Sequence, residues 1–352
     1  MSSIERREAT RSYPRGAWVA RWRTPDGKSR KRTFERKVDA QRHIDRVTAS
    51  LVTGQYVDPR AGRATFRVYA DAWLAAQVHK PSTAALYEGH LRRNVYPILG
   101  DLPLDSILPS TVQAWIKRLS MDDPVTDRVA LAPATVTTVY KIVATILRSA
   151  VRDRKVAVSP CSGIALPEIE SKRVQPMTTE QVELLRDAIR PELRALVVLI
   201  AGTGLRSSEA LGLTRDRLRL LGKNPSVIVD RQLVTLSGVG GKVSFGSPKT
   251  RSSLRTVPLP RVVVAALNEH LAEHEVEADG LVFTLGSEPI TRQRIGHAWR
   301  PAAAAAGLNE ATGTGQHALR HYYASLLIRY GESVKTVQAR LGHASATETL
   351  DT

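Results

Sequence analysis

The chain has 352 residues, and its 51 Lys and Arg against 34 Asp and Glu give a formal net charge of +17. This charge predicts a polyanionic partner, with nucleic acid first and an anionic membrane surface second, or else a basic surface that only aids solubility. The single cysteine, Cys161, excludes an internal disulfide and fits a reducing, intracellular setting. The first 16 residues lack the apolar core of a signal peptide, and the longest apolar run, residues 196–202, is too short to span a bilayer, which takes about 20 residues.

The N-terminal sixth of the chain is its most basic part. Residues 1–62 contain 15 Lys or Arg and seven Asp or Glu. Residues 16–23 alternate apolar and basic side chains, which predicts a strand with tryptophans on one face and arginines on the other. A TPDG turn and a second basic strand, KSRKRTF, follow, and residues 38–54 have the apolar spacing of a helix that ends at Gly54. The sequence thus predicts a small β-plus-helix module.

A basic β-ribbon has the shape and the charge to enter the major groove of DNA. The candidate DNA contacts in this module are Arg21, Arg23, Lys31 and Arg32. The alternative interpretation is a basic sheet face that is only solvated.

The middle of the chain, residues 63–170, predicts a bundle of four or five helices followed by a linker. Thr65 is expected to cap the first helix, the second is expected to break before Pro97, and Pro133 lies near the start of the last one. The stretch from residue 159 to residue 177 is rich in Pro and Ser and has no periodicity, as is typical of a linker.

Residues 171–352 predict a third domain that is mainly helical with one small antiparallel sheet. Strands over residues 226–238 and 242–260 flank a Gly-rich turn, and helices precede and follow them. The last helix has a Ser333 cap and a Gly342 stop. The expected fold class is therefore mainly α with small antiparallel sheets, in three domains.

Common enzyme signatures are absent from the sequence. It has no G-x-x-x-x-G-K-[ST] phosphate loop, no G-x-S-x-G elbow and no H-E-x-x-H motif. The histidines of the third domain lack cysteine partners and a carboxylate cluster, so we expect no metal site.

Several cationic side chains and histidines lie beside residues that end or interrupt helices and strands. Arg206 comes just after two glycines at a predicted helix start, with Glu209 one turn on. An arginine there opposes the helix dipole, which suggests a site for an anion. Lys249 lies in the connection between two strands, where most lysines are only solvated. His317 and Arg320 are three residues apart and share one helix face.

A further histidine, His343, follows the Gly342 stop, where it could equally be a capping or surface residue. Together these segments resemble the tyrosine recombinase family, the phage-type integrases. The motifs that carry the resemblance are G-x-R-x-x-E-x-x-x-L, a hairpin lysine, H-x-L-R-H-x-x-A-S and L-G-H, and all occur here in order. The three-part layout resembles integrases that bind arm-type and core-type DNA sites.

The resemblance implies an active site. Its implied catalytic residues are Arg206, Lys249, His317, Arg320 and His343, with Glu209 in a supporting role. The two arginines would hold the scissile phosphate, because planar guanidinium groups match phosphate oxygens bidentately. Both histidines would hydrogen-bond the phosphate, His317 would also assist proton transfer, and Lys249 would protonate the departing 5′ oxygen.

The nucleophile departs from the family pattern. In the family a tyrosine follows L-G-H by one or two helical turns, but residues 344–352, ASATETLDT, contain none. Tyr322, Tyr323 and Tyr330 are expected to be core or surface residues. We therefore expect the nucleophile just past Thr352, and this chain to bind DNA without cleaving it.

The resemblance implies a site-specific DNA recombinase that works through a 3′-phosphotyrosine intermediate, with no metal, ATP or other cofactor. The implied partners are double-stranded DNA with core-type and arm-type sites, three further copies in a tetramer on DNA, and an accessory DNA-bending protein, with no membrane. The implied location is the cytoplasm of a phage or bacterial host, at the nucleoid. Two alternatives remain, a type IB topoisomerase and a non-catalytic DNA-binding decoy or regulator.

Overall fold

A computed structural model gives the fold of the chain. It describes residues 2–9, 16–24, 27–53, 56, 58, 61–124, 127–170, 175–235, 243–248, 251–277, 280–309 and 313–342. The chain divides into two compact units, Met1–Glu170 and Ser171–Thr352. The described part is mainly helical with small antiparallel sheets, which confirms the expected fold class.

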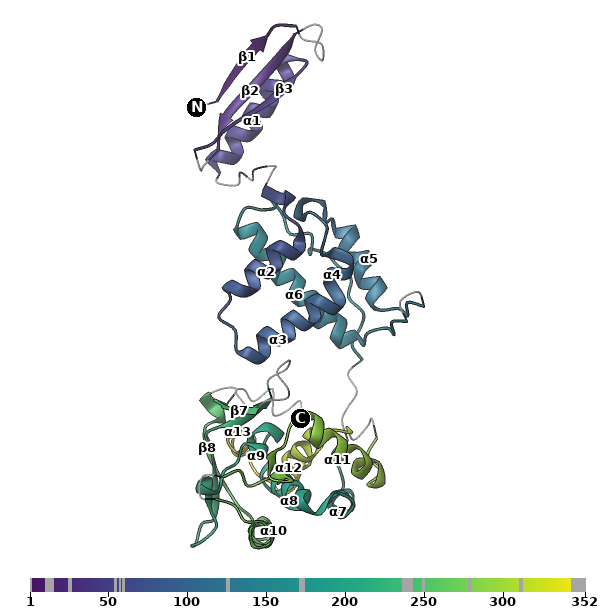
Figure 1. The fold of residues 1–352 in the computed structure, drawn as a ribbon, viewed down its shortest axis with the longest axis vertical. Coiled ribbons are helices and arrows are strands. Elements are labelled where there is room, and N and C mark those ends of the chain that lie inside the picture. Colours follow the sequence, from purple (N-terminus) through teal and green to yellow (C-terminus); the bar gives the residue numbers. More distant parts are fainter. Residues whose placement is uncertain are drawn as a thin grey trace. The chain divides into compact units, whose positions relative to one another are not determined.

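The first module is a three-stranded antiparallel sheet with one helix along one of its faces (Figure 1). Its elements are β1 (Ser3–Arg7), β2 (Ala17–Arg23), β3 (Ser29–Phe34) and α1 (Lys37–Val52), and the strands pair in the order β1-β2-β3. Trp18 and Trp22 of β2 join the core with Ile44 of α1, as the alternation predicted. Trp22 Nε1 also donates a hydrogen bond to Tyr56 Oη at 2.9 Å.

Strand β1 was not predicted from the sequence. Its sequence, SIERR, has a single apolar residue, so an edge strand of this kind lacks the alternation that marks a half-buried strand. The helix ends at Val52, and the predicted stop at Gly54 lies outside the described residues.

A helical bundle with its own core follows in the same unit. Its elements are α2 (Phe66–Ala76), α3 (Pro81–His90), a π turn (Leu91–Val95), α4 (Tyr96–Leu99), α5 (Pro109–Leu119) and α6 (Pro133–Arg152). Thr65 caps α2 as predicted, since its side chain accepts a hydrogen bond from the Val68 N–H. Prolines lie in the first turns of α3, α5 and α6, where the missing N–H removes no helical hydrogen bond.

The predicted break before Pro97 is wrong. The chain stays helical from α3 through the π turn Leu91–Val95 into α4. The wider π turn changes the hydrogen-bond register, so Pro97 falls in the first turn of α4, where no backbone N–H is needed.

Among the described residues, one helix, α6, is long and apolar enough by length and composition to cross a membrane. Half of that stretch is buried inside the bundle, where Val139 and Ile146 are fully enclosed. This burial is typical of the core helix of a helical domain.

The second unit is built around helix α8 (Arg194–Thr203), of whose 10 residues seven are buried. The other helices that the structure describes in this unit are α7 (Thr179–Ala188), α9 (Ser207–Leu211), α10 (Arg261–Glu273), α11 (Arg292–Ala305), α12 (His317–Arg329) and α13 (Val334–Leu341). Ser333 caps α13 through its side chain, and Gly342 ends it in the left-handed conformation (φ +68°), as predicted.

The strands that the structure describes in the second unit form three small sheets rather than the single sheet that the sequence predicted. They are β4 (Leu218–Arg219), β5 (Ser226–Val229) and β8 (Arg255–Pro258) in one sheet, β6 (Gln232–Thr235) with β7 (Val243–Gly246), and β9 (Thr284–Leu285) with β10 (Glu288–Pro289). The division falls at Asp230, whose carboxylate accepts hydrogen bonds from Arg217 and Arg231 between β5 and β6.

The sequence analysis also missed helix α11. Pro301 lies inside this helix, and two of its four buried residues are alanines, so the apolar periodicity is weak.

Gly204 ends α8 at a point where space is very tight. Its φ is +65°, and a Cβ at this position would lie 2.5 Å from Tyr323 Cδ1 and 2.7 Å from Leu341 Cδ2. Both the backbone conformation and the close approach of α12 and α13 therefore require glycine here.

We predict that Gly204→Ala lowers the free energy of unfolding by about 2–4 kcal/mol, because it adds overpacking to left-handed backbone strain. Gly307 is the matched control, since its φ is +68° and nothing lies within 4 Å of a Cβ there. Gly307→Ala should cost about 1 kcal/mol from the backbone alone. Urea unfolding of both variants measures the difference, and equal losses would contradict the packing argument.

Candidate active site

Arg206 lies where the chain leaves α8 and enters the short helix α9. Glu209, three residues on, has a side chain that is only 1% exposed. Its Oε2 accepts a hydrogen bond from the Arg206 backbone N–H at 3.0 Å, and its Oε1 accepts one from Arg206 Nη1 at 3.0 Å. One buried carboxylate thus fixes both the backbone and the guanidinium group of Arg206.

A second arginine, Arg255 of β8, holds the same carboxylate from another side. Arg255 Nη2 donates to Glu209 Oε2 at 2.9 Å, and the Arg255 side chain is 6% exposed. Burial raises the pKa of Glu209, but the hydrogen bond and charge of Arg255, together with Arg206, outweigh burial and hold this pKa below its ordinary value. Glu209 is therefore ionised between two guanidinium groups at neutral pH.

Three arginines meet at the C-terminal end of α13. Arg255 Nε donates to the carbonyl of Arg340 at 2.7 Å, Arg320 Nη2 to that of Leu341 at 2.7 Å, and Arg206 Nη2 to that of Gly342 at 3.3 Å. The last carbonyls of a helix have no partner within it and carry partial negative charge. Three consecutive carbonyls are thus each bonded by an arginine from a different element.

Arg320, on α12, is 1% exposed, and its Nη1 also donates to the carbonyl of Gly204 at 2.6 Å. It therefore joins the end of α8 to the end of α13. His317, the first residue of α12, is exposed, and its ring meets the edge of the His321 ring with 4.7 Å between centroids. The structure thus buries the arginine of this motif and exposes its first histidine.

The structure brings three of the predicted site residues together, namely Arg206, Glu209 and Arg320. The predicted lysine and second histidine, Lys249 and His343, lie outside the described residues, so their roles stay predictions. Sequence reasoning missed Arg255 as part of the cluster, although strand alternation could have found it. Arg255 and Val257 lie two apart on β8 and so share a face, and Val257 is fully buried.

The tyrosines near this site lie as expected. Tyr322 and Tyr323 are buried, and Tyr330 is 80% exposed at the end of α12. The Tyr322 hydroxyl lies 3.1 Å from the Thr179 hydroxyl, and the Tyr323 hydroxyl accepts a hydrogen bond from Arg340 at 3.5 Å. These contacts fit packing roles in the core.

The basic sheet of the first module separates its candidate DNA contacts by face. Arg21 pairs with Lys31 across β2 and β3, whereas Ala20 pairs with Arg32. Directly opposite residues share a face of the sheet, so Arg32 lies on the face that carries α1, together with Phe34, over whose ring its guanidinium lies. Arg21, Lys31 and, by alternation, Arg23 are exposed on the open face.

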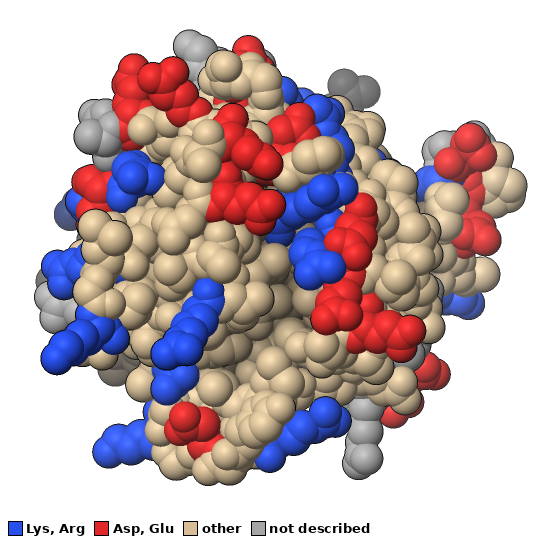
Figure 2. Space-filling model, turned by 90° about the horizontal axis from the view of Figure 1, so that it is seen from below, with Lys and Arg blue, Asp and Glu red and all other residues tan. Residues whose placement is uncertain are grey.

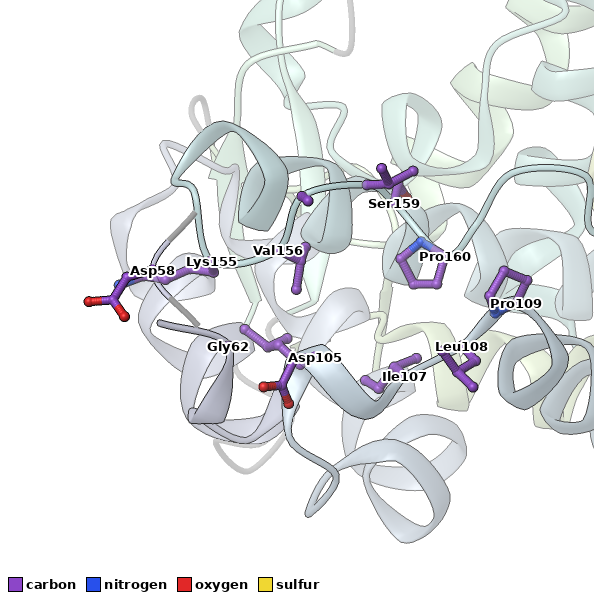
Figure 3. A pocket seen from close by; sticks show the side chains of 13 residues that line it. Asp58, Gly62, Asp105, Ile107, Leu108, Pro109, Lys155, Val156, Ser159 and Pro160 are labelled. Atoms are coloured by element: carbon purple, nitrogen blue, oxygen red, sulfur yellow. The ribbon is translucent and has the colours of Figure 1, made fainter. Parts of the chain in front are cut away.

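Other surfaces fit a phosphate less well. A pocket of about 480 Å³ in the first unit has an apolar lining that includes Val156 and Ile107, together with the carboxylates of Asp58 and Asp105 (Figure 3). The face of the protein shown in Figure 2 mixes acidic and basic side chains around an uncharged area.

The pocket has two carboxylates and one lysine, Lys155, whereas the open sheet face gathers Arg21, Arg23 and Lys31 around Glu5, which pairs with Arg21 at 3.3 Å. The arginine cluster and the open sheet face are therefore better candidates for binding a polyanion. Among the described residues, no group of three His, Cys, Asp or Glu side chains could hold a metal ion.

Comparisons with known proteins match this arrangement. A model described as "Phage integrase family" matches residues 175–351, and one described as "Phage integrase, N-terminal SAM-like domain" matches residues 65–120. The enzyme class that the fold and site define is that of the tyrosine recombinases, a name that further relatives carry. The chain belongs to the phage integrase family.

The integrase of Mycobacterium phage D29 is 25% identical to the chain over 325 residues, which cover 89% of this chain and 83% of the relative. The Tn1549 transposon integrase in complex with a circular intermediate DNA is 23% identical, with a TM-score of 0.69 over 80% of this chain and 92% of that one. A lambda integrase tetramer bound to a Holliday junction is 17% identical, with a TM-score of 0.56 over 97% of this chain and 96% of that one. At these identities the two structures support the fold alone.

We predict that Glu209→Gln lowers the free energy of unfolding by about 3–5 kcal/mol at pH 7, because it leaves two guanidinium groups without their shared carboxylate. The folded-state pKa of Glu209 is depressed, so its stabilisation is present above about pH 4.5, the ordinary value, and is lost as the pH falls further. The difference from the parent chain should therefore shrink below about pH 4.5.

Urea unfolding between pH 7 and pH 4 measures this difference. Glu183→Gln is the control, because Glu183 is an exposed glutamate on α7 in the same unit. It should change stability little at any pH. A loss for Glu209→Gln that does not vary with pH would contradict the ionised network.

Proposed function

We propose that this protein is a site-specific DNA integrase that cuts and rejoins double-stranded DNA through a 3′-phosphotyrosine intermediate. The observation that carries the proposal is the convergence of Arg206 and Arg320 on the end of α13, immediately before His343. Guanidinium groups held by a scaffold can neutralise the charge that develops on a phosphate in phosphoryl transfer.

In the proposed reaction Arg206 and Arg320 grip the non-bridging oxygens of the scissile phosphate, and His317 and His343 donate further hydrogen bonds. A tyrosine hydroxyl attacks phosphorus and loses its proton with the assistance of His317. The bond from phosphorus to the 5′ oxygen breaks as Lys249 donates a proton to that oxygen. The free 5′-hydroxyl of another strand then reverses the step, so the energy of the phosphodiester bond is kept and no nucleotide is consumed.

The three parts of the chain have separate tasks in this proposal. Residues 1–62 bind arm-type sites, and residues 63–170 and 171–352 hold the core site. Recombination joins two duplexes, so we propose a homotetramer on DNA, which the tetrameric lambda integrase on a Holliday junction supports, with an accessory DNA-bending protein. The proposed location is the nucleoid in the cytoplasm of a bacterial or phage-infected host.

The residues that follow the L-G-H motif do not supply the proposed nucleophile, because residues 343–352 contain no tyrosine. Tyr322 and Tyr323 are buried core residues, and Tyr330 lies at the end of α12. We therefore do not expect any of the three to attack a bound phosphate. We therefore propose that residues 1–352 bind DNA but do not cleave it unless a nucleophilic tyrosine is added.

Trapping on a nicked core-site DNA tests this. Residues 1–352 should bind the DNA without a covalent adduct, and the same chain with a C-terminal extension carrying a tyrosine should form one. Arg206→Ala in the extended chain should abolish the adduct and leave DNA binding within about threefold, because most phosphate contacts lie elsewhere. Denaturing gels measure the adduct, and fluorescence anisotropy measures binding.

Each other outcome has a clear meaning. An adduct from residues 1–352 alone would refute the account of the nucleophile. Binding without an adduct from either chain favours a non-catalytic DNA-binding protein. Relaxation of supercoiled DNA by the extended chain without site preference favours a type IB topoisomerase.

The open face of the β-sheet generates a second prediction. Replacing both Arg21 and Lys31 with alanine should weaken binding to arm-type DNA, and the slope of log affinity against log salt should fall by about 2, one for each lost phosphate contact. Arg32→Ala is the matched control, because Arg32 is an exposed cation on the opposite face. Anisotropy titrations over a range of salt concentrations measure the slopes, and equal effects of the two changes would overturn the assignment to the open face.

A further inference from the structure

Arg255 is the one member of the arginine cluster for which the family motifs give no role. It contacts three segments that are far apart in the sequence. Its Nη2 donates to Glu209 on α9, its Nε to the carbonyl of Arg340 on α13, and its Nη1 to the carbonyl of Ser253 at 3.0 Å. Each of the three guanidinium nitrogens thus bonds a different segment.

The neighbouring Ser253 ties the same segment to Arg206. Ser253 is fully buried in the short helical turn Arg251–Ser253, and its hydroxyl accepts a hydrogen bond from Arg206 Nη1 at 3.1 Å. This turn begins two residues after Lys249 in the sequence. The segment that follows the proposed general acid is therefore bonded to the arginine that is proposed to hold the phosphate.

Gly342 shows how closely Arg255 approaches the end of α13. A Cβ on Gly342 would lie 3.1 Å from Arg255 Nη1 and 3.0 Å from the carbonyl oxygen of Ser252. The left-handed glycine that ends α13 leaves room for the guanidinium group, and His343 follows it directly in the sequence. Arg255 thus lies between the segment after Lys249 and the segment before His343.

We propose that Arg255 is a positioning residue of the active site, which holds Glu209 and the end of α13 in place and thereby sets where Arg206 meets the phosphate. The proposal rests on the proposed integrase function for its catalytic consequence. Lysine cannot replace Arg255, because a single ammonium group lacks the rigid planar fork that bonds three partners in fixed directions.

Arg255→Lys and Arg255→Met test the proposal in two measurements. In residues 1–352, hydrogen exchange in α13 should become at least about tenfold faster in both variants, because the helix end loses a charge-assisted hydrogen bond. In the chain extended with a tyrosine, the single-turnover rate of cleavage at saturating DNA should fall by about 100-fold in both variants, since the catalytic groups are misplaced.

A pH profile separates positioning from general loss of stability. Without Arg255, the buried Glu209 keeps one arginine partner instead of two, so the cleavage rate of Arg255→Met, measured relative to that of the unsubstituted extended chain, should fall as the pH is lowered towards 5. The double variant Arg255→Met, Glu209→Gln should lose this dependence on pH. A role in folding alone would leave the profile of correctly folded molecules unchanged.

Arg294→Met is the matched control. Arg294 also bonds a carboxylate, Glu288 at 2.9 Å, and a backbone carbonyl, that of Leu285 at 2.6 Å, but it does so on α11. It should leave both α13 exchange and the cleavage rate unchanged. If Arg255 variants match Arg294→Met in both measurements, the proposal is overturned. Faster exchange in α13 with no cleavage by the unsubstituted extended chain would support positioning and refute the integrase function instead.

Discussion

The second unit depends on how the carbonyl end of α13 is held. A helix end carries partial negative charge and unpaired carbonyls, and here Arg206, Arg320 and Arg255 reach it from three separate elements. Each guanidinium group bonds one of these carbonyls and also a second partner. The loop after α8, strand β8 and helix α12 are therefore all fixed relative to the end of α13. The partial negative charge of these carbonyls also offsets part of the positive charge of the three largely buried guanidinium groups.

Glu209 completes this arrangement as a buried anion between two cations. The described network contains three guanidinium groups and one carboxylate, so it keeps an excess of positive charge. Such an excess is costly to bury and is stabilised by an anion, which a phosphodiester supplies. In the proposed reaction, the side chains that stabilise the fold would therefore also be the ones that bind the phosphate.

The sequence predicted a large part of this molecule because local signals marked it. Caps at Thr65 and Ser333, the stop at Gly342 and the alternation of β2 each depend on short-range chemistry, and each is present in the structure. The predicted break at Pro97 was wrong because a π turn shifts the hydrogen-bond register of the helix. The propensities of single residues do not reveal such a turn.

In the candidate site, too, the residues marked by a local pattern could be predicted from the sequence. Motif residues Arg206, Glu209 and Arg320 could be selected from sequence because their spacing is characteristic, and the structure brings them together. The partnership of Arg255 with Glu209 spans 46 positions, and its bond to the end of α13 spans 85. No local pattern encodes such contacts, so only the fold could show them.

The basic side chains of the N-terminal sheet are divided between its two faces. Of the basic side chains on its strands, Arg6, Arg30 and Arg32 lie on the side of α1, where Arg30 is paired with Asp58 at the linker. The total basic charge of this segment, which is conspicuous in the sequence, is therefore larger than the charge that its open face presents to a nucleic acid. In the proposed complex with DNA, the number of phosphates that the sheet neutralises would reflect only its open face. That number would underestimate the basicity that steers the protein towards DNA from a distance.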